Sequence, residues 1–571
     1  MPFVRTDKPK EPTTVQGETG TFTIKPDGVY FAKFGNDGKP QAERRICSRL
    51  RVLGQTRSVM AHDWGRLLEW RDNDGNTHRW AMPMNMLAGD GTDVSRELLG
   101  RGLNIAAGKG KLVLEYVQSS ESINRMTCTD KTGWHGGAYV TPDRVYGDDA
   151  GAYIYQSGGG AEITTGQAGT LEEWRDNVSA FAVGNSRLAF AISTVFAGVL
   201  VYPAGIESGG FHVHGGSSSG KTTAQLMAAS ADGSPDVRKR SWRATANGLE
   251  GVATLHNDGL LILDEMREAS AKDVSETAYM LGNGQGKTRS DRNGNARQAK
   301  TWRLLFLSSG EITLAELLQS EGKRVYAGQE VRVTDISADA GAGMGIFEEL
   351  HGFDKPAALA DHLRYATAKY YGTAGAVWLE HITQNHRQLW DTLPEQINQF
   401  CAEVAPDVSG QAHRVCKRFG LVAFAGELAT RYGLTGWQEG EATAAAKRCF
   451  RDWLAGFGTG NREHLQILEA VRAFVERNGA KFQDMTFENP PPIHDLVGFH
   501  RPAGSGVGRE YIVLASQFAR VCEGFGSKQV IAVLQEVGWI PRPGSDGKST
   551  TRESLPGLGQ KRVYVIHIKE D

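Results

Sequence analysis

The segment that most constrains the fold is a loop rich in glycine and serine near the middle of the chain. Residues 215–223 read GGSSSGKTT, and the first eight of them match the pattern GxxxxGK[ST]. The preceding FHVHG has the composition of a buried strand, and the following TTAQLMAAS is typical of a helix. In such a strand–loop–helix unit, backbone N–H groups surround phosphate oxygens and the helix dipole adds positive charge. The sequence therefore predicts a P-loop domain of the α/β class that binds ATP.

The residues of this loop have separate expected roles toward ATP and Mg²⁺. Lys221 is expected to bridge the β- and γ-phosphates, and the Thr222 hydroxyl is expected to bind Mg²⁺. The remaining residues offer backbone N–H groups or hydroxyls to the phosphates. The predicted nucleotide-binding residues are Gly215, Gly216, Ser217, Ser218, Ser219, Gly220, Lys221, Thr222 and Thr223.

A second element supplies two carboxylates. Residues 260–265 read LLILDE and begin 39 residues after Lys221, so a short apolar strand leads directly into Asp264 and Glu265. We expect Asp264 to hold Mg²⁺ through water, and Glu265 to orient and polarise the water that attacks the γ-phosphate. The adjacent acidic pair argues against a kinase or a Ras-type switch protein, which take their catalytic carboxylate or glutamine from elsewhere.

A third apolar strand, residues 304–307, is followed by two serines. In ATPases with an additional strand between the P-loop strand and the acidic strand, that strand ends in a polar sensor of the γ-phosphate. Ser308 or Ser309 fits this position, and we predict Ser309, which lies 45 residues after Asp264. The alternative is an ordinary turn at the end of a strand.

Residues 282–303 form a basic segment in a chain whose formal net charge is only −2. Four glycines and a single acid, Asp291, indicate a hairpin or an exposed loop. The basic residues are Lys287, Arg289, Arg292, Arg297, Lys300 and Arg303. Because a basic hairpin can follow a phosphate backbone, we predict DNA contact by Lys287, Arg289 and Arg292. The alternatives are a solvated loop that neutralises nearby acids, and a loop that touches the nucleotide of a neighbouring subunit.

Arg332 lies beyond the predicted sensor strand, before another short strand. In ring-shaped ATPases an arginine in this region enters the site of the next subunit and stabilises the charge of the transition state. We therefore predict that Arg332 acts in trans. Arg324 is a rival for this role, and Arg364 in the following helical segment is a candidate second sensor. A surface salt bridge is the alternative for each of them.

Changes in composition divide the chain into five predicted parts. They are a flexible polar lead-in, an N-terminal α+β domain, an AAA+ ATPase core, a helical lid or bundle, and a winged-helix-like C-terminal domain. The core is expected to be a parallel sheet with helices on both faces, since short apolar strands alternate with helical segments. The five parts cover, in order, residues 1–20, 21–170, 171–355, 356–458 and 459–571.

The N-terminal domain is predicted from short alternating segments broken by glycines. Strands are expected at 29–34, 66–72 and 111–117, with a helix at Ser95–Gly100. His135 follows a tryptophan and is interpreted as a packing residue rather than a ligand.

The C-terminal part predicts helices at 464–478, Ser516–Glu523 and Ser527–Gly538, and a last strand at 562–568. Helix, short turn, helix and a strand pair is the order of a winged helix-turn-helix. Such modules bind DNA or other proteins, and both readings stay open.

No segment is expected to enter a membrane. The longest apolar stretch, Leu188–Tyr202, is shorter than the roughly 20 residues that span a bilayer and is interpreted as a buried helix. The first residues have no apolar core of signal-peptide length. The six cysteines form no CxxC pair, so neither a zinc ribbon nor a redox motif is indicated, and a reducing cytoplasm is expected.

The motifs GGSSSGKTT, LLILDE, LGNGQGKTR, WRLLFLSSGE and GQEVRVTDI together resemble the P-loop family catalogued as domain of unknown function 927. Its members occur on phages, phage satellites and staphylococcal cassette elements, and are similar to MCM-type AAA+ replicative helicases. The resemblance covers roughly residues 20–370, and most specifically 185–350. It implies a hexameric ring with ATP sites between subunits, a C-terminal winged helix in some relatives, and a pore hairpin that carries Lys287 and Arg289.

Two features depart from the MCM pattern. A serine stands where MCM proteins have a sensor asparagine. Only 43 residues separate Lys221 from Asp264, too few for the long insert in helix two, which puts a second pore hairpin in doubt.

The resulting hypothesis is an ATP-dependent DNA helicase that helps to replicate a mobile element. Its expected partners are single-stranded DNA in a central pore, a forked duplex, further copies of the same chain in a hexamer, and a primase or initiator of the element. One rival is an ATP-switched initiator or helicase loader without unwinding activity. The other is an ATPase that remodels proteins.

Overall fold

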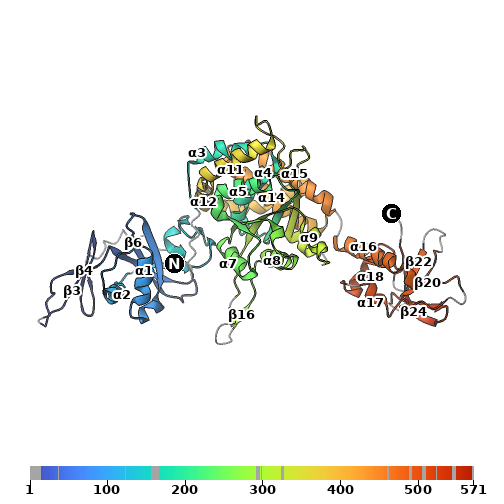
Figure 1. The fold of residues 1–571 in the computed structure, drawn as a ribbon, viewed down its shortest axis with the longest axis horizontal. Helices are drawn as coiled ribbons and strands as arrows, with labels where there is room; N and C mark the ends of the chain where they lie inside the picture. Colours follow the sequence, from blue (N-terminus) through green and yellow to red (C-terminus); the bar gives the residue numbers. More distant parts are fainter. Residues whose placement is uncertain are drawn as a thin grey trace. The chain divides into compact units, whose positions relative to one another are not determined.

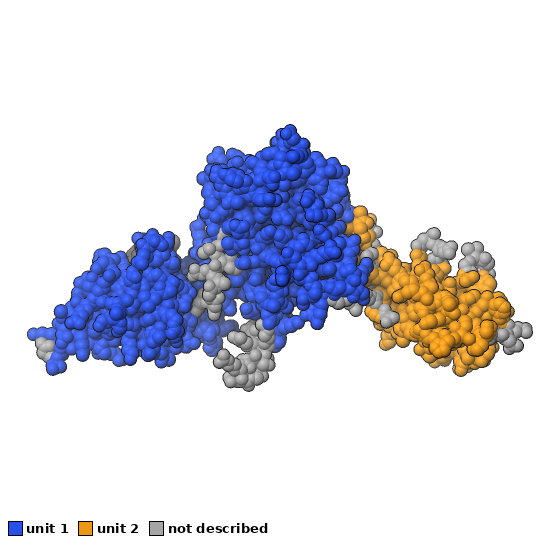
Figure 2. Space-filling view, in the orientation of Figure 1, with its two compact units in different colours: residues 1–324, 332–404, 417–452 blue, residues 325–331, 405–416, 453–571 orange. Residues whose placement is uncertain are grey.

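The computed structural model divides into two compact units (Figure 2). The first comprises residues 1–324, 332–404 and 417–452, and the second comprises residues 325–331, 405–416 and 453–571. Each unit is described by itself. The described residues are 14–36, 38–122, 124–155, 166–290, 296–297, 299–322, 327–458, 462–487, 491–503, 509–522, 524–542 and 548–568.

The first strands of the chain form two sheets (Figure 1). Strands β1 to β4 are antiparallel neighbours in chain order, and the second sheet has the order β12-β8-β5-β6-β7. Two helices, α1 and α2, share a hydrophobic core with both sheets, to which Phe22, Trp70, Leu98 and Val113 belong. The bounds are β1 Thr14–Gln16, β2 Gly20–Lys25, β3 Gly28–Lys33, β4 Arg44–Cys47, β5 Leu50–Arg57, β6 Gly65–Arg71, β7 Thr77–Pro83, α1 Thr92–Gly100, α2 Gly110–Ser119, β8 Arg125–Thr129 and β12 Tyr153–Tyr155.

The predicted strand at 111–117 is wrong, because these residues lie in helix α2. Its buried residues are Val113, Leu114, Tyr116 and Val117, which cover one side of a helix. A short apolar run fits a strand or a helix equally well by pattern, and packing against the neighbouring sheets selects the helix. The strands predicted at 29–34 and 66–72 and the helix predicted at Ser95–Gly100 are confirmed as β3, β6 and α1.

The central sheet has five parallel strands in the order β14-β15-β18-β13-β19. All seven residues of β18 are buried, as expected for a strand in the middle of a parallel sheet. The carboxyl ends of these strands meet at one edge, and this edge carries the predicted site. The bounds are β13 Gly209–His214, β14 Lys239–Ser241, β15 Gly259–Asp264, β18 Leu304–Gly310 and β19 Val333–Ser337.

The apolar stretch before the sheet is the buried helix α4, Ser186–Leu200, as predicted. It packs against α5, β15 and β18, and all of its residues are buried. A Cβ atom on Gly198 would lie 2.5 Å from the carbonyl carbon of Gly259, so the helix approaches the sheet closely at this point. Within the described ranges, no helix has the length and apolar character needed to cross a membrane.

Helices surround and follow the sheet. α11 and α12 pack on α5 and α3. The helical stretch predicted between Pro356 and Phe457 is confirmed as α11 to α15. The bounds are α3 Leu171–Asn177, α5 Lys221–Asp232, α6 Pro235–Arg238, α7 Ala246–Leu255, α8 Ala271–Asn283, α9 Leu314–Ser320, α10 Ala327–Arg332, α11 Pro356–Lys369, α12 Thr373–Gln384, α13 His386–Val404, α14 Gly410–Arg431 and α15 Glu441–Phe457.

The described residues from 462 to 568 of the second unit form a five-stranded sheet with the order β20-β21-β22-β24-β23 and the helices α16, α17 and α18. The predicted helix 464–478 is α16, but the helix predicted at Ser516–Glu523 is only the four-residue α17. The antiparallel pair β23-β24 ends the unit, but the sheet is larger than the strand pair of the predicted winged helix. The bounds are α16 Arg462–Arg477, β20 Phe482–Asp484, β21 Gly498–Pro502, β22 Arg509–Leu514, α17 Phe518–Val521, α18 Ser527–Glu536, β23 Thr551–Leu555 and β24 Gly559–His567.

Candidate active site

The loop between β13 and α5 has the tight backbone that its glycines predict. Gly220 has φ +89°, Gly215 has φ +156°, and Ser218 has φ +63°. A Cβ atom on Gly220 would lie 2.4 Å from Cγ2 of Ile346, so no larger residue fits at this position without a shift. Helix α5 begins at Lys221, directly after the loop, which aligns its free N–H groups with the loop interior.

Lys221 lies folded against the loop. Its Nζ donates hydrogen bonds to the carbonyl oxygens of Gly215 and Gly216, at 2.7 and 2.8 Å. The side chain is buried, so its charge is held inside the loop rather than in bulk water. Thr222 is exposed at the first turn of α5, while Thr223 is buried behind it. The arrangement offers one ammonium group, one hydroxyl and a set of backbone N–H groups to an anion.

Asp264 and Ser309 meet at the carboxyl ends of two neighbouring strands. Ser309 Oγ donates to Asp264 Oδ1 at 2.7 Å, and it accepts a hydrogen bond from the backbone N–H of Glu265 at 3.2 Å. Glu265 has φ +52°, a left-handed conformation that is unfavourable for a residue with a side chain. Such backbone strain is concentrated at functional sites. The structure therefore brings together Asp264, Glu265 and Ser309, three of the predicted catalytic residues.

Ser308, the other sensor candidate, is occupied inside the core. Its hydroxyl lies 2.9 Å from Nδ1 of His212 and accepts a hydrogen bond from Trp242 Nε1 at 2.8 Å. Burial lowers the pKa of His212 to about 4, so the ring is neutral. Since Nε2 of His212 lies 3.0 Å from the carbonyl oxygen of Ile312 and donates to it, Nδ1 accepts the proton of Ser308. Ser308 is thus a packing residue, and only Ser309 reaches the acidic pair.

Lys239, on the edge strand β14, is a site residue that the sequence did not indicate. Its Nζ lies 2.7 Å from Asp264 Oδ2. β14 runs parallel to β15, with Ser241 opposite Asp264. The contact depends on the register of two strands that are separated by a helix, and nothing in the local sequence KRSWR marks it. The ion pair shows that the Asp264 carboxylate already holds a cation in this structure.

The donor set fits ATP and Mg²⁺. Mg²⁺ prefers hard oxygen ligands and keeps several waters, and the exposed Thr222 hydroxyl and the partly exposed Asp264 carboxylate are ligands of this kind. Lys221 and the loop N–H groups are the complementary donors for phosphate oxygens. Among the described residues, no group of three or more His, Cys, Asp and Glu side chains is placed to hold a metal ion.

The two ends of the basic segment after α8 pair with each other as the arms of an antiparallel hairpin. Gly286 N–H donates to Lys300 O at 2.8 Å, Trp302 N–H donates to Gly284 O at 2.9 Å, and β16 (Arg289–Ser290) pairs with β17 (Ala296–Arg297). Lys287 is exposed and forms a surface ion pair with Glu276 at 3.1 Å. Arg292 and the side chain of Arg289 lie outside the described residues. In contrast, residues 221–264 are fully described and contain no hairpin.

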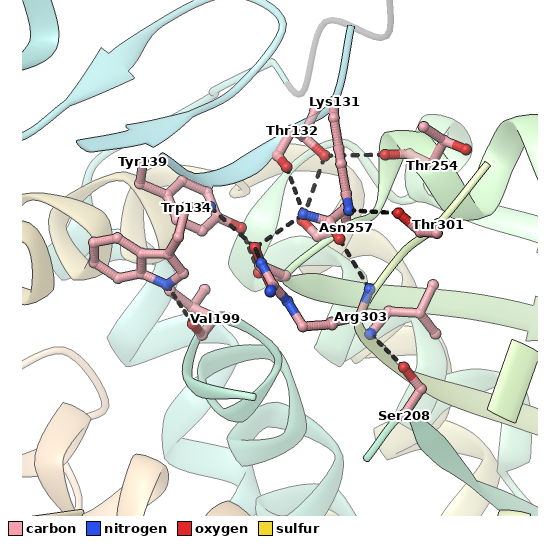
Figure 3. A network of polar contacts seen from close by, with 12 residues as sticks. Lys131, Thr132, Trp134, Tyr139, Val199, Ser208, Thr254, Asn257, Thr301 and Arg303 are labelled. Atoms are coloured by element: carbon pink, nitrogen blue, oxygen red, sulfur yellow. Dashed lines mark hydrogen bonds and ion pairs between the residues drawn. The ribbon is translucent and has the colours of Figure 1, made fainter. Parts of the chain in front are cut away.

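Arg303, counted with the basic hairpin from the sequence, instead forms an ion pair with a buried carboxylate, and its own side chain is 38% exposed (Figure 3). Its Nε and Nη2 lie 2.8 and 3.0 Å from the two carboxylate oxygens of Asp258, whose side chain is fully buried. The guanidinium also stacks over Tyr202, 3.9 Å from the ring centroid. Since Asp258 immediately precedes β15 and Arg303 immediately precedes β18, the pair ties together the beginnings of the two strands that carry Asp264 and Ser309.

Asp258, the acidic partner of Arg303, also binds residues 131–140, which include the short strands β9 (Gly133–His135) and β10 (Ala138–Val140). The backbone N–H of Trp134 donates to Asp258 Oδ2 at 3.0 Å, and the Tyr139 hydroxyl donates to Asp258 O at 2.6 Å. Burial raises the pKa of Tyr139 well above its ordinary value, so the hydroxyl keeps its proton. Trp134 Nε1 donates to Val199 O in α4 at 2.8 Å. β10 also pairs with β11 (Val145–Tyr146).

His135 is a packing residue in this structure, as predicted. Its Nε2 contacts Lys131 O and Thr129 Oγ1 at 2.9 and 3.2 Å, and burial lowers its pKa. All six cysteines are buried, and none of them forms a disulfide.

The three candidate arginines lie in different surroundings. Arg332 ends α10 just before β19, so it lies at the amino end of this strand, whereas the P-loop follows the carboxyl end of the neighbouring strand β13. Its guanidinium lies 4.9 Å from the ring centroid of Tyr279. Arg364 is exposed on α11, 3.7 Å from Asp361. Arg324 lies outside the described residues. Neither Arg332 nor Arg364 contacts the Asp264 carboxylate of its own chain.

The comparisons with known proteins agree with this architecture. The family model described as domain of unknown function 927 matches residues 22–301. The solved structure of SCCmec type IV Cch, described as an active helicase, has a TM-score of 0.70 over 96% of this chain and 97% of its own, at 18% identity. The C-terminal region of NrS-1 in its A form covers 67% of this chain and 87% of its own at 9% identity, with a TM-score of only 0.26.

No curated protein matches the chain. At 18% identity, the likeness to SCCmec type IV Cch establishes a shared fold. The match to the family model of domain of unknown function 927 covers residues 22–301, and the P-loop and the acidic strand lie within these residues.

Proposed function

We propose that the protein is an ATP-dependent DNA helicase of the MCM-like AAA+ type, which acts in the replication of a mobile element. The observation that carries the proposal is that the P-loop follows the carboxyl end of β13 in the same parallel sheet in which Ser309 binds Asp264 and the Glu265 backbone. The shared fold with SCCmec type IV Cch, described as an active helicase, supports it. The basic hairpin adjoining the same domain supplies the expected DNA contact.

In the proposed reaction, Lys221 holds the β- and γ-phosphates, because its ammonium group already lies among the loop carbonyls. Glu265 accepts a hydrogen bond from the attacking water and orients it. Ser309 fixes the Asp264 carboxylate and contacts the Glu265 backbone, so it reports changes at the γ-phosphate to both acids. Mg²⁺, held by Thr222 and Asp264, would neutralise charge on the phosphate oxygens.

The proposed assembly is a hexameric ring with ATP sites between subunits. Arg332 supports it, because this arginine lies at the amino end of β19, whereas its own P-loop lies beyond the carboxyl end of the neighbouring strand β13. An arginine placed there is suited to reach the site of a neighbouring copy. We further propose cytoplasmic action on a forked duplex with a primase or initiator of the element, and a winged-helix role for the second unit.

Replacing Lys287 and Arg289 by alanine should stop strand separation and leave DNA-independent ATP hydrolysis within about twofold of the wild type. Lys287 forms its ion pair with Glu276 and not with Lys221 or Asp264. Because this pair is exposed, it contributes little to the free energy of unfolding. Two rates are measured on the same protein: steady-state ATP hydrolysis, and displacement of a labelled strand from a duplex. An equal loss of both activities would place these residues at the nucleotide site instead.

Lys239→Gln should lower the Mg²⁺ concentration that gives half-maximal hydrolysis by about twofold to fivefold. The reason is that the ammonium group competes with Mg²⁺ for Asp264, and a partly exposed ion pair is worth up to ~1 kcal/mol. Lys272→Gln, an exposed lysine on α8, is the matched control. An unchanged or increased Mg²⁺ requirement would show that Lys239 assists Asp264 rather than competing for it.

Stimulation of hydrolysis by single-stranded DNA separates the helicase from an ATPase that remodels proteins. We expect the hydrolysis rate to rise when oligothymidine is added, and the rise to be absent in the Lys287 and Arg289 variant. Hydrolysis that is indifferent to DNA would favour the protein-remodelling alternative.

A further inference from the structure

A polar hollow lies over one face of the sheet formed by β5, β6 and β7, in the blue part of the ribbon in Figure 1. It has a volume of about 660 Å³, within the range of ligand sites. Its charged lining residues are Asp27, Arg49, Arg51, Glu69, Arg71 and Arg79. Four guanidinium groups therefore face two carboxylates around one opening.

The arginines share a face because of strand register. Side chains alternate between the two faces of a strand, so Glu69 and Arg71 on β6 point to the same side, and Arg49 lies immediately before β5. Arg51 lies directly opposite Glu69, and Glu69 lies directly opposite Arg79. The strands thus position Arg51, Arg71 and Arg79, and Arg49 lies directly before β5.

Glu69 organises two of the arginines. Its Oε1 lies 2.5 Å from Nη1 of Arg51, and its Oε2 lies 2.8 Å from Nε of Arg79. The Glu69 side chain is largely buried, with 11% of its surface exposed, whereas that of Arg79 is 62% exposed. A guanidinium has five N–H donors, so each arginine keeps donors that can point into the hollow. Glu69 therefore orients Arg51 and Arg79.

The two acids leave an excess of positive charge. Asp27 is engaged outside the arginine row, since it accepts a hydrogen bond from the Tyr30 hydroxyl at 2.6 Å and its carbonyl oxygen accepts one from Arg45 at 2.7 Å. Arg71 stands opposite Thr77, not opposite an acid, and is exposed. Like charges that lie close together on a sheet face repel one another, so an anion that binds among them reduces this repulsion.

We propose that this hollow binds the phosphodiester backbone of single-stranded DNA, which gives the amino-terminal part of the chain a role in holding the strand. Planar guanidinium groups bind phosphate oxygens in pairs, and four of them around an open trough suit a chain of successive phosphates. Trp70, which also lines the hollow, is almost fully buried and donates its indole N–H to Arg101 O, so contact is to the backbone without base stacking. This inference rests on the proposed function in that DNA is the substrate.

The test is the affinity of the full-length chain for a labelled single-stranded oligothymidine, measured by fluorescence anisotropy without nucleotide between about 50 and 200 mM salt. The variant carries Arg49→Gln and Arg71→Gln. Binding should weaken about tenfold at low salt, and the slope of log affinity against log salt should fall by about 1.4, because each lost phosphate contact on a single strand removes about 0.7.

The matched control carries Arg96→Gln and Arg125→Gln, which remove two exposed arginines of the same region that do not line the hollow. It should bind DNA like the wild type. Both variants should retain DNA-independent hydrolysis, which reports that the chain is folded. An unchanged affinity and salt slope in the Arg49 and Arg71 variant would overturn the inference, as would equal losses in the control.

Two further outcomes are decisive. If an acidic peptide bound in an Arg49- and Arg71-dependent manner and DNA did not, the hollow would be a protein-docking site and the inference would be wrong. If the variant lost DNA affinity while the wild type never separated strands, the hollow would stand and the helicase proposal would fall. If the wild type separated strands and the variant kept its DNA affinity, the helicase proposal would stand and the inference about the hollow would be wrong.

Discussion

Lys221→Ala should reduce ATP hydrolysis by at least about a hundredfold and abolish strand separation with it. Removing one preorganised donor from a developing negative charge typically costs about 10²–10³ in rate. Lys239, the other lysine described at the site, cannot take over the phosphate contact of Lys221. It lies on the edge strand β14 and is already paired with Asp264. Hydrolysis is measured by phosphate release at saturating ATP.

The control for this experiment is Lys272→Ala, which removes an exposed lysine from α8 and should keep the wild-type rate. Nucleotide binding is followed with a fluorescent ATP analogue, and we expect it to weaken together with the rate. A Lys221→Ala protein that hydrolyses ATP within tenfold of the wild type would show that the loop is not the catalytic nucleotide site.

Arg303→Met should lower the melting temperature of the unit that contains the P-loop by roughly 6–20 °C. The substitution leaves the Asp258 carboxylate charged, fully buried and without its ion-pair partner. Breaking a buried pair in this way costs about 3–5 kcal/mol. In a domain of this size, 1 kcal/mol corresponds to a shift of about 2–4 °C. Scanning calorimetry measures the effect, and the relevant transition is the one that ATP and Mg²⁺ raise.

A double substitution separates the ion pair from simple loss of packing. Arg303→Met combined with Asp258→Asn leaves no buried charge unpaired, so it should recover a large part of the lost stability. Arg243→Met, which removes an exposed arginine, should change stability by at most about 0.5 kcal/mol. If the single Arg303→Met variant melted like the wild type, Asp258 would not depend on Arg303, and the network in Figure 3 would not hold the two strands together.

The parts of the site that were predictable from the sequence are local in the chain. The phosphate loop is one contiguous segment, and its glycines are demanded by positive φ angles at Gly215 and Gly220. The LLILDE strand likewise carries both acids at its own end. The parallel sheet followed from alternating strands and helices, and the order of its strands places β18 between β13 and β15.

The parts that were not predictable depend on contacts between distant segments. Ser308 and Ser309 are equivalent in the sequence, and only the packing of His212 and Trp242 against Ser308 distinguishes them. Lys239 reaches Asp264 through the register of an edge strand. Arg303 was grouped with the hairpin because it ends a basic segment, yet its partner Asp258 lies 45 residues earlier. The helix at α2 was mistaken for a strand because a run of seven residues carries too little periodicity to decide.

The most direct test of the proposed helicase activity is displacement of a labelled strand from a forked DNA duplex by the purified full-length chain. With ATP and Mg²⁺, we expect the labelled strand to be released, and we expect no release by the Lys221→Ala protein or with a non-hydrolysable ATP analogue. Wild-type protein that hydrolyses ATP and binds the fork, but releases no strand under any of these conditions, would contradict the helicase proposal and favour an ATP-switched initiator or loader.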